Sequence, residues 1–144
     1  MNSSDIARAL EVAKRAARVG GSVARARLAD PGYLQWKGSR DVATDASFEV
    51  QKVIVRTIED ESTDIAVLAK EGPEDTLIPV DAKYLWIVDP VCGSLNFAHG
   101  LPHFGISIAL RAEGRIIAGV VYDPCRDELF EAATDSPSKL NDRK

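Results

Sequence analysis

The sequence predicts an α+β fold in which two N-terminal helices pack on a mainly antiparallel sheet. Apolar residues recur at helical spacing in the first part of the chain, and short apolar or alternating runs bounded by turn residues occupy the second part. Helices followed by mostly consecutive strands are typical of a layered α+β domain with an antiparallel sheet.

The first helix is expected to begin at a cap formed by Ser3 or Ser4 and to end near Ala29, before Asp30-Pro31-Gly32. The pair Gly20-Gly21 lies inside this helix. It indicates a kink, a close contact of the helix with a neighbour, or simply that the helix tolerates two glycines there. Thr44 or Asp45 caps a second helix, whose apolar stripe is formed by Val50, Ile54 and Ile58.

Strands dominate the rest of the chain. A short strand is expected at 33–36, a buried strand at 64–69 and a loop at 71–81. Glu113-Gly114 should form a hairpin turn. The remaining strands are expected at 84–88, 104–111, 115–122 and 127–132. We place one domain at residues 1–133 and a frayed, polar C-terminal tail at residues 134–144.

Composition narrows the class of protein. The chain has 144 residues, 45% of them apolar and 28% charged, which is ordinary for a globular domain. A net charge of −4 gives no sign of a nucleic-acid or membrane partner. Two cysteines are too few for a disulfide framework, and the N-terminus lacks the apolar core of a signal peptide. We therefore expect a cytoplasmic protein.

The stretch Tyr84–Phe104 carries the strongest functional signal. A buried strand leads into Asp89-Pro90, then into the small-residue loop Cys92-Gly93-Ser94 and a short helical turn. A carboxylate at the end of a strand, followed by free backbone N–H groups, is a suitable place for a metal ion and a phosphate.

This stretch resembles the signature of the inositol monophosphatase family, in the run WIVDPVCGSLNF and the following GLPHFGISI. The likeness continues through 119–124 and 127–130. Upstream, Lys37 and the segment 41–44 resemble another family motif. The resemblance covers nearly the whole chain. It implies a layered sugar-phosphatase fold and magnesium-dependent hydrolysis of phosphate monoesters of sugars and related small molecules.

The chain departs from the family pattern where the acidic residues should stand. Family carboxylates are replaced by Ser47, Gln51, Lys70 and Cys92. A lysine repels a metal ion, and soft sulfur is a poor ligand for magnesium. The family's C-terminal half, which carries a further metal aspartate, is also absent from the sequence. We therefore expect magnesium to bind weakly or not at all, and the protein to be a pseudoenzyme.

The resemblance assigns roles to the residues that remain. Asp89, Ser94 and Lys37 are the remnant catalytic residues, and Gly93, Ser94 and Lys70 would bind phosphate. Asp89, the carbonyl of Val91 and Glu71 would form any residual metal site. Either Lys70 pairs with Asp89 and closes that site, or Glu71 points there and keeps it open. A nucleophilic role for Cys92 is not expected, because no histidine has a clear place beside it.

Three functions stay open. The chain is an inactive family member that binds a phosphate or sugar phosphate without magnesium, or an enzyme with residual phosphatase activity. The third alternative is an interaction module. The face that meets the C-terminal half in the family would be uncovered, which predicts a homo-oligomer or pairing with a full-length relative.

Overall fold

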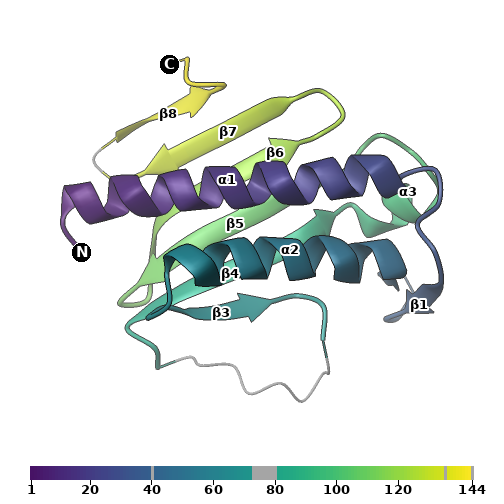
Figure 1. The fold of residues 1–144 in the computed structure, drawn as a ribbon, viewed down its shortest axis with the longest axis horizontal. Coiled ribbons are helices and arrows are strands. Elements are labelled where there is room, and N and C mark those ends of the chain that lie inside the picture. Colours follow the sequence, from purple (N-terminus) through teal and green to yellow (C-terminus); the bar gives the residue numbers. More distant parts are fainter. Residues whose placement is uncertain (40, 73–80, 135, 144) are drawn as a thin grey trace.

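The computed structural model describes residues 1–39, 41–72, 81–134 and 136–143. Two long helices lie side by side across one face of a six-stranded sheet (Figure 1). The sheet order is β3-β4-β5-β6-β7-β8. The β3–β4 pair is parallel and every other neighbouring pair is antiparallel. The predicted fold class, two helices on a mainly antiparallel sheet, is confirmed.

The first helix, α1, spans Ser3–Arg27. Its cap is Asn2 rather than Ser3 or Ser4. The Asn2 side chain accepts from the backbone N–H of Asp5, and the Asp5 carboxylate accepts from the backbone of Asn2. The cap therefore lies one or two residues earlier than expected. The expected end near Ala29 is likewise two residues late.

The glycine pair of α1 marks a close helix contact. A Cβ on Gly20 would lie 2.5 Å from Cγ1 of Ile54, and one on Gly21 would lie 2.5 Å from Cε1 of Tyr122. Glycine therefore lets α1 approach both the neighbouring helix and the sheet. Of the three readings that the sequence left open, the structure supports the close contact.

The second helix, α2, spans Asp45–Glu61 and is capped by Thr44, one of the two expected residues. Its stripe of Val50, Ile54 and Ile58 is fully buried. These side chains pack with the helix-facing side of the sheet, where Trp86, Ile106 and Ile108 are also fully buried. The core thus lies between the helix layer and the sheet.

The strands form at the expected places with shifted ends. A separate two-stranded sheet joins β1 (Leu34–Trp36) and β2 (Val42–Thr44). The large sheet consists of β3 (Ala66–Ala69), β4 (Tyr84–Cys92), β5 (Gly105–Ala112), β6 (Arg115–Asp123), β7 (Glu128–Ala133) and β8 (Ser136–Leu140). The short helix α3 spans Ser94–Ala98.

Three local expectations need correction. The tail is not frayed, because Ser136–Leu140 pairs with β7 as an edge strand, and Asp142 binds Lys14 of α1 at 2.8 Å. Strand β3 lies at the sheet edge and is only partly covered, not buried. Strand β4 continues through Asp89-Pro90 with an irregular register instead of turning there. Most of the loop expected at 71–81 lies outside the described residues.

The second face of the sheet has no helix layer in the described part of the chain (Figure 1). Val121 and Phe130 are paired across β6 and β7 there, and their exposed fractions are 48% and 46%. Together with Ala109, Gly119 and Ala132 they help to line a hollow of about 880 Å³. Among the described helices, none is long and apolar enough to cross a membrane.

Candidate functional site

The candidate site lies at the C-terminal end of β4, where β3 also ends. The backbone N–H of Lys70 donates to the carbonyl of Val88 at 3.0 Å, which fixes the residue after β3 against β4. Helix α3 and the small β1–β2 sheet lie at the same end of the molecule (Figure 1). Side chains from four separated segments therefore converge there.

A single ammonium group lies between two carboxylates at this place. The Nζ of Lys70 is 3.3 Å from Oδ1 of Asp41 and 3.8 Å from Oδ2 of Asp89. The hydroxyl of Ser94 donates to the same Asp41 oxygen at 2.9 Å, and the backbone N–H of Val91 donates to Asp89 at 3.2 Å. Of the two arrangements that the sequence left open, the structure shows Lys70 beside Asp89, while Glu71 pairs with Lys37.

The charges in this cluster stabilise one another. Burial would raise the pKa of the Asp41 carboxyl, but hydrogen bonds from Ser94 and Lys70 and the lysine charge outweigh it, so that pKa is lowered. Burial would lower the pKa of Lys70, but the charge of Asp89 and the hydrogen bond to Asp41 raise it. The lysine is therefore charged and the aspartate ionised at neutral pH.

Glu71 belongs to a second, more buried pair. Its side chain is 1% exposed, and its Oε2 lies 2.6 Å from the Nζ of Lys37. Gln51 clamps the same residue through the main chain. The Gln51 amide donates to the Glu71 carbonyl at 2.5 Å and accepts from the Glu71 N–H at 2.7 Å. Glu71 and Lys37 thus form an ion pair with each other. The sequence predicts instead that Glu71 belongs to a residual metal site and Lys37 to the remnant catalytic residues.

Cys92 is a neutral thiol in this environment. Burial, a hydrogen bond to Asp89 and the charge of Asp89 raise the pKa of the thiol to about 12. Only a negligible fraction is thiolate at neutral pH, and the thiolate is the form that attacks electrophiles or binds metals. The raised pKa therefore disfavours attack by the Cys92 thiol at neutral pH.

Ser47 and Gly93 have local structural tasks. Ser47 is buried and completes the cap of α2, because its backbone N–H donates to Thr44 and its hydroxyl accepts from the Thr44 N–H. Gly93 has φ of +95°, a conformation that side chains rarely adopt. It starts α3, which has five residues and offers only a minimal anion-binding end. Phosphate binding by Gly93 and Ser94 therefore stays a prediction.

The donor set does not fit a bound magnesium ion. Magnesium requires hard oxygen ligands, supplied mainly by carboxylates. Here an ammonium lies between the two nearest carboxylates, and the neighbouring side chain is a protonated thiol. Within the described ranges, no group of three or more histidine, cysteine or acidic side chains is arranged to hold a metal ion.

Two residues of this site were not on the predicted list. Asp41 accepts from both Lys70 and Ser94, and Gln51 clamps Glu71. Asp41 could have been predicted from the sequence, because it is the first residue of the segment 41–44, which resembles a family motif. The two hydrogen bonds between Gln51 and the main chain of Glu71 could not have been predicted from the sequence, because they depend on how α2 faces the end of β3.

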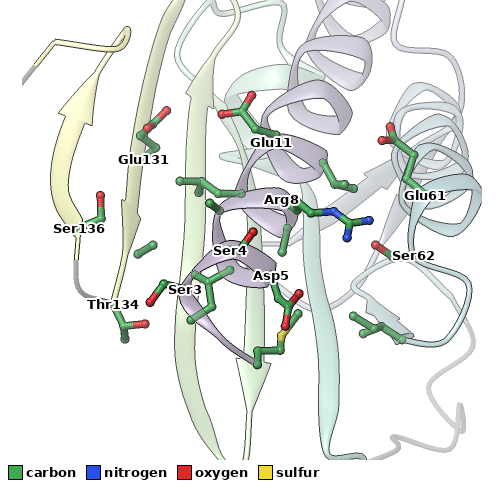
Figure 2. Close-up of a pocket in the computed structure, with 18 of the residues that line it drawn as sticks. Ser3, Ser4, Asp5, Arg8, Glu11, Glu61, Ser62, Glu131, Thr134 and Ser136 are labelled. Carbon is green, nitrogen blue, oxygen red and sulfur yellow. The ribbon is translucent and has the colours of Figure 1, made fainter.

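A second hollow, of about 810 Å³, follows the first turns of α1. Figure 2 shows its polar groups on two sides of the helix, with Glu61 and Ser62 toward α2, and Glu131 and Ser136 toward β7 and β8. The helix separates the two sets. Glu61 is bound by Arg15, and Glu131 by Lys14 and Lys139. Among the described residues that line this hollow, no set of polar side chains converges on one point.

Comparison with known proteins identifies the family. Residues 5–144 match the profile of the inositol monophosphatase family. The chain belongs to this family. It is 36% identical over 137 residues to the Nus factor SuhB of Pasteurella multocida, and 37% identical over 108 residues to the inositol-1-monophosphatase of Rhizobium meliloti. These matches cover 94% and 75% of this chain, respectively.

Solved structures agree with the family assignment. The extragenic suppressor protein suhB of Bartonella henselae superposes with a TM-score of 0.86 at 34% identity, over 95% of this chain. The inositol monophosphatase of Thermotoga maritima gives 0.79 at 30% identity, over 90% of this chain. The match covers 51% of the Pasteurella protein and 52% of the Bartonella chain, so this chain spans about half the length of these relatives.

Proposed function

We propose that this chain is a pseudoenzyme of the inositol monophosphatase family, which does not hydrolyse sugar phosphates by the magnesium-dependent route. The position of Lys70 is the main support, since its ammonium lies within 3.3 Å of Asp41 and 3.8 Å of Asp89. A divalent ion would have to displace this group against its charge. The commitment of Glu71 to Lys37 and the protonation of Cys92 also favour this proposal.

A phosphate-release assay tests the proposal. The purified chain is incubated with inositol 1-phosphate and a panel of sugar phosphates, in the presence of Mg²⁺ or Mn²⁺. The expected release equals that of the D89A variant, which removes the carboxylate that survives from the central motif. Turnover that requires a divalent metal and disappears in D89A would support the alternative of a residual phosphatase.

Binding of a phosphate or sugar phosphate without magnesium belongs to the same proposal. The two nearby lysines already pair with carboxylates, so any anion must compete with Asp41, Asp89 and Glu71. We therefore expect weak binding at most. Titration calorimetry with inorganic phosphate, with and without Mg²⁺, would measure it, and tight binding that depends on Mg²⁺ would contradict the proposal.

A second candidate function, self-association, is favoured by the outer face of the sheet. Val121 and Phe130 lie half exposed beside a hollow with small side chains at Ala109, Gly119 and Ala132. Apolar surface of this kind is usually buried by association. A second copy of the chain is the partner that is always present at matched concentration.

Light scattering coupled to gel filtration tests this second function. We expect a dimer that the F130K variant converts to a monomer, with F48K as the control on the opposite side of the molecule. Phe48 is 39% exposed on α2 and away from the outer sheet face. A monomer at all concentrations would exclude self-association, and the remaining arrangement, pairing with a full-length relative, would then be tested by mixing the two proteins.

A further inference from the structure

A third hollow, of about 430 Å³, lies between the C-terminal half of α1 and the turn that joins β6 to β7. Arg18, Ser22 and Arg25 line it from the helix. Tyr122 lines it from the end of β6, and Pro124 lines it from the turn. We call this hollow the arginine groove. It shares no residue with the candidate site at the end of β4.

The floor of the arginine groove is closely packed. Helix α1 approaches the sheet at Gly21, where a Cβ would lie 2.5 Å from the ring of Tyr122 and 3.0 Å from the Cβ of Pro124. The guanidinium of Arg18 lies over the same ring, with its Cζ 5.6 Å from the ring centroid. A cation is attracted to the face of an aromatic ring, so this contact holds the Arg18 guanidinium at the groove.

The charges around the groove do not cancel. Arg18 pairs with Asp127 at 3.3 Å, and Arg126, in the turn, pairs with Asp123 at 2.6 Å. Arg25 is exposed, and it forms no ion pair with any carboxylate in the described part of the chain. One guanidinium charge therefore remains available to a ligand.

The guanidinium of Arg25 lies close enough to the turn for its charge to act there. Burial and the charge of Asp123 raise the pKa of the Cys125 thiol, and the charge of Arg25 opposes this rise. Arg25 lies two helical turns after Arg18, roughly 10 Å along the axis, with Ser22 between them on the same side of α1. Both long side chains can therefore reach an anion that lies over Ser22.

We propose that the arginine groove binds a phosphoryl group, carried by inorganic phosphate or by a small phosphate monoester. A guanidinium donates two parallel hydrogen bonds to an oxyanion, so two arginines favour an anion with more than two acceptor oxygens. A phosphoryl group offers at least three and carries close to two negative charges at neutral pH, whereas a monocarboxylate offers two and carries one. Arg18 donates to Asp127 through one terminal nitrogen, which leaves its other N–H groups for the anion.

The test must locate the bound anion, because phosphate at the candidate site near Lys70 would also produce heat in a calorimetric titration. Two-dimensional ¹H–¹⁵N NMR of the full chain, titrated at constant ionic strength, reports each backbone amide separately. We expect inorganic phosphate and inositol 1-phosphate to shift the amides of residues 18–26 and 122–127 saturably, and acetate to shift them far less. Tighter binding of the ester would identify a phosphate monoester as the ligand, and equal affinities would identify free phosphate.

Two variants with the same change of charge show whether Arg25 holds the anion. R25Q should bind phosphate at least about tenfold more weakly at the groove, which is the usual loss for a hydrogen bond to a charged group. R8Q is the matched control, because Arg8 is also exposed on α1 and does not line the groove. R8Q should bind like the unmodified chain.

Three results would overturn the proposal. The first is the absence of saturable shifts at the groove, including the case in which phosphate shifts only the amides of residues 70–72 and 89–96. That case would leave phosphate binding at the candidate site intact. The second is an equal loss of affinity in R25Q and R8Q, which would indicate a general effect of charge. The third is acetate binding as tight as phosphate binding, which would exclude recognition of a phosphoryl group.

Discussion

Replacing Lys37 by methionine should destabilise the fold far more than loss of a surface charge would. The change keeps most of the side-chain volume and removes the ammonium that lies 2.6 Å from Glu71. The Glu71 side chain is 1% exposed, so its charge has almost no access to water. The K37M variant therefore leaves the buried Glu71 side chain without its cationic partner.

The size of the effect follows from the burial of the pair. Removing one partner of a buried ion pair costs about 3–5 kcal/mol, and an exposed pair contributes about 1 kcal/mol or less. Lys37 itself is 23% exposed, so the expected cost of K37M lies at or just below the lower end of the buried range, at about 2–3 kcal/mol. For a chain of this length that corresponds to a fall in Tm of roughly 6–12 °C.

Urea unfolding of K37M, E71Q and the double variant measures the pair directly. E71Q should cost less, about 1–2 kcal/mol, because the partly exposed lysine can recover some hydration. The double variant should lose less free energy of unfolding than the sum of the two single losses. The difference should be at least about 1 kcal/mol. A cost below about 0.5 kcal/mol for K37M, with a coupling near zero, would refute the claim that Glu71 depends on Lys37.

Three further predictions concern other parts of the molecule. Cys92, with a pKa of about 12, should react with iodoacetamide at pH 8 at least a hundredfold more slowly than the thiol of glutathione. Mass spectrometry of the peptide that contains Cys92 measures the rate. A rate equal to that of glutathione would contradict the prediction. The raised pKa of Lys70 contributes stability that is present below its ordinary value of 10.5 and is lost as the pH rises through the folded value. Stability of the unmodified chain should therefore fall more steeply above about pH 10.5 than that of K70Q, and parallel pH curves would argue against the pair. G20A should cost about 1–2 kcal/mol in urea unfolding, because its Cβ would lie 2.5 Å from Ile54, whereas S22A on the exposed side of α1 should not destabilise.

The sequence predicted the layered fold because its strongest patterns reflect local physics. The stripe of Val50, Ile54 and Ile58 has helical period, and the turn at Glu113-Gly114 adopts positive φ at both residues. Strand β8 was missed because an edge strand needs only backbone pairing. Its polar residues show neither the helical nor the strand periodicity of apolar residues. The contact between Lys14 and Asp142, which helps to hold the chain after β8, joins residues that are distant in the sequence.

The candidate site was predictable only in part. The register of the family motif left two arrangements open, with either Lys70 or Glu71 beside Asp89, and the structure shows Lys70 there. The pairing of Glu71 with Lys37 was not foreseen, because it depends on a tertiary contact between the segment after β1 and the end of β3. Gln51, counted as a lost carboxylate, clamps the Glu71 backbone instead. A substitution that removes one function can therefore supply a structural contact that the sequence does not reveal.

The most direct test of the account is a calorimetric titration of the unmodified chain with Mg²⁺ and with Mn²⁺ at neutral pH. The account predicts no saturable binding of either ion up to millimolar concentration, because the ammonium of Lys70 already lies between Asp41 and Asp89. The D89N variant should give the same trace. Saturable binding of Mg²⁺ to the unmodified chain, lost in D89N, would show that the metal displaces the lysine and would contradict the central claim.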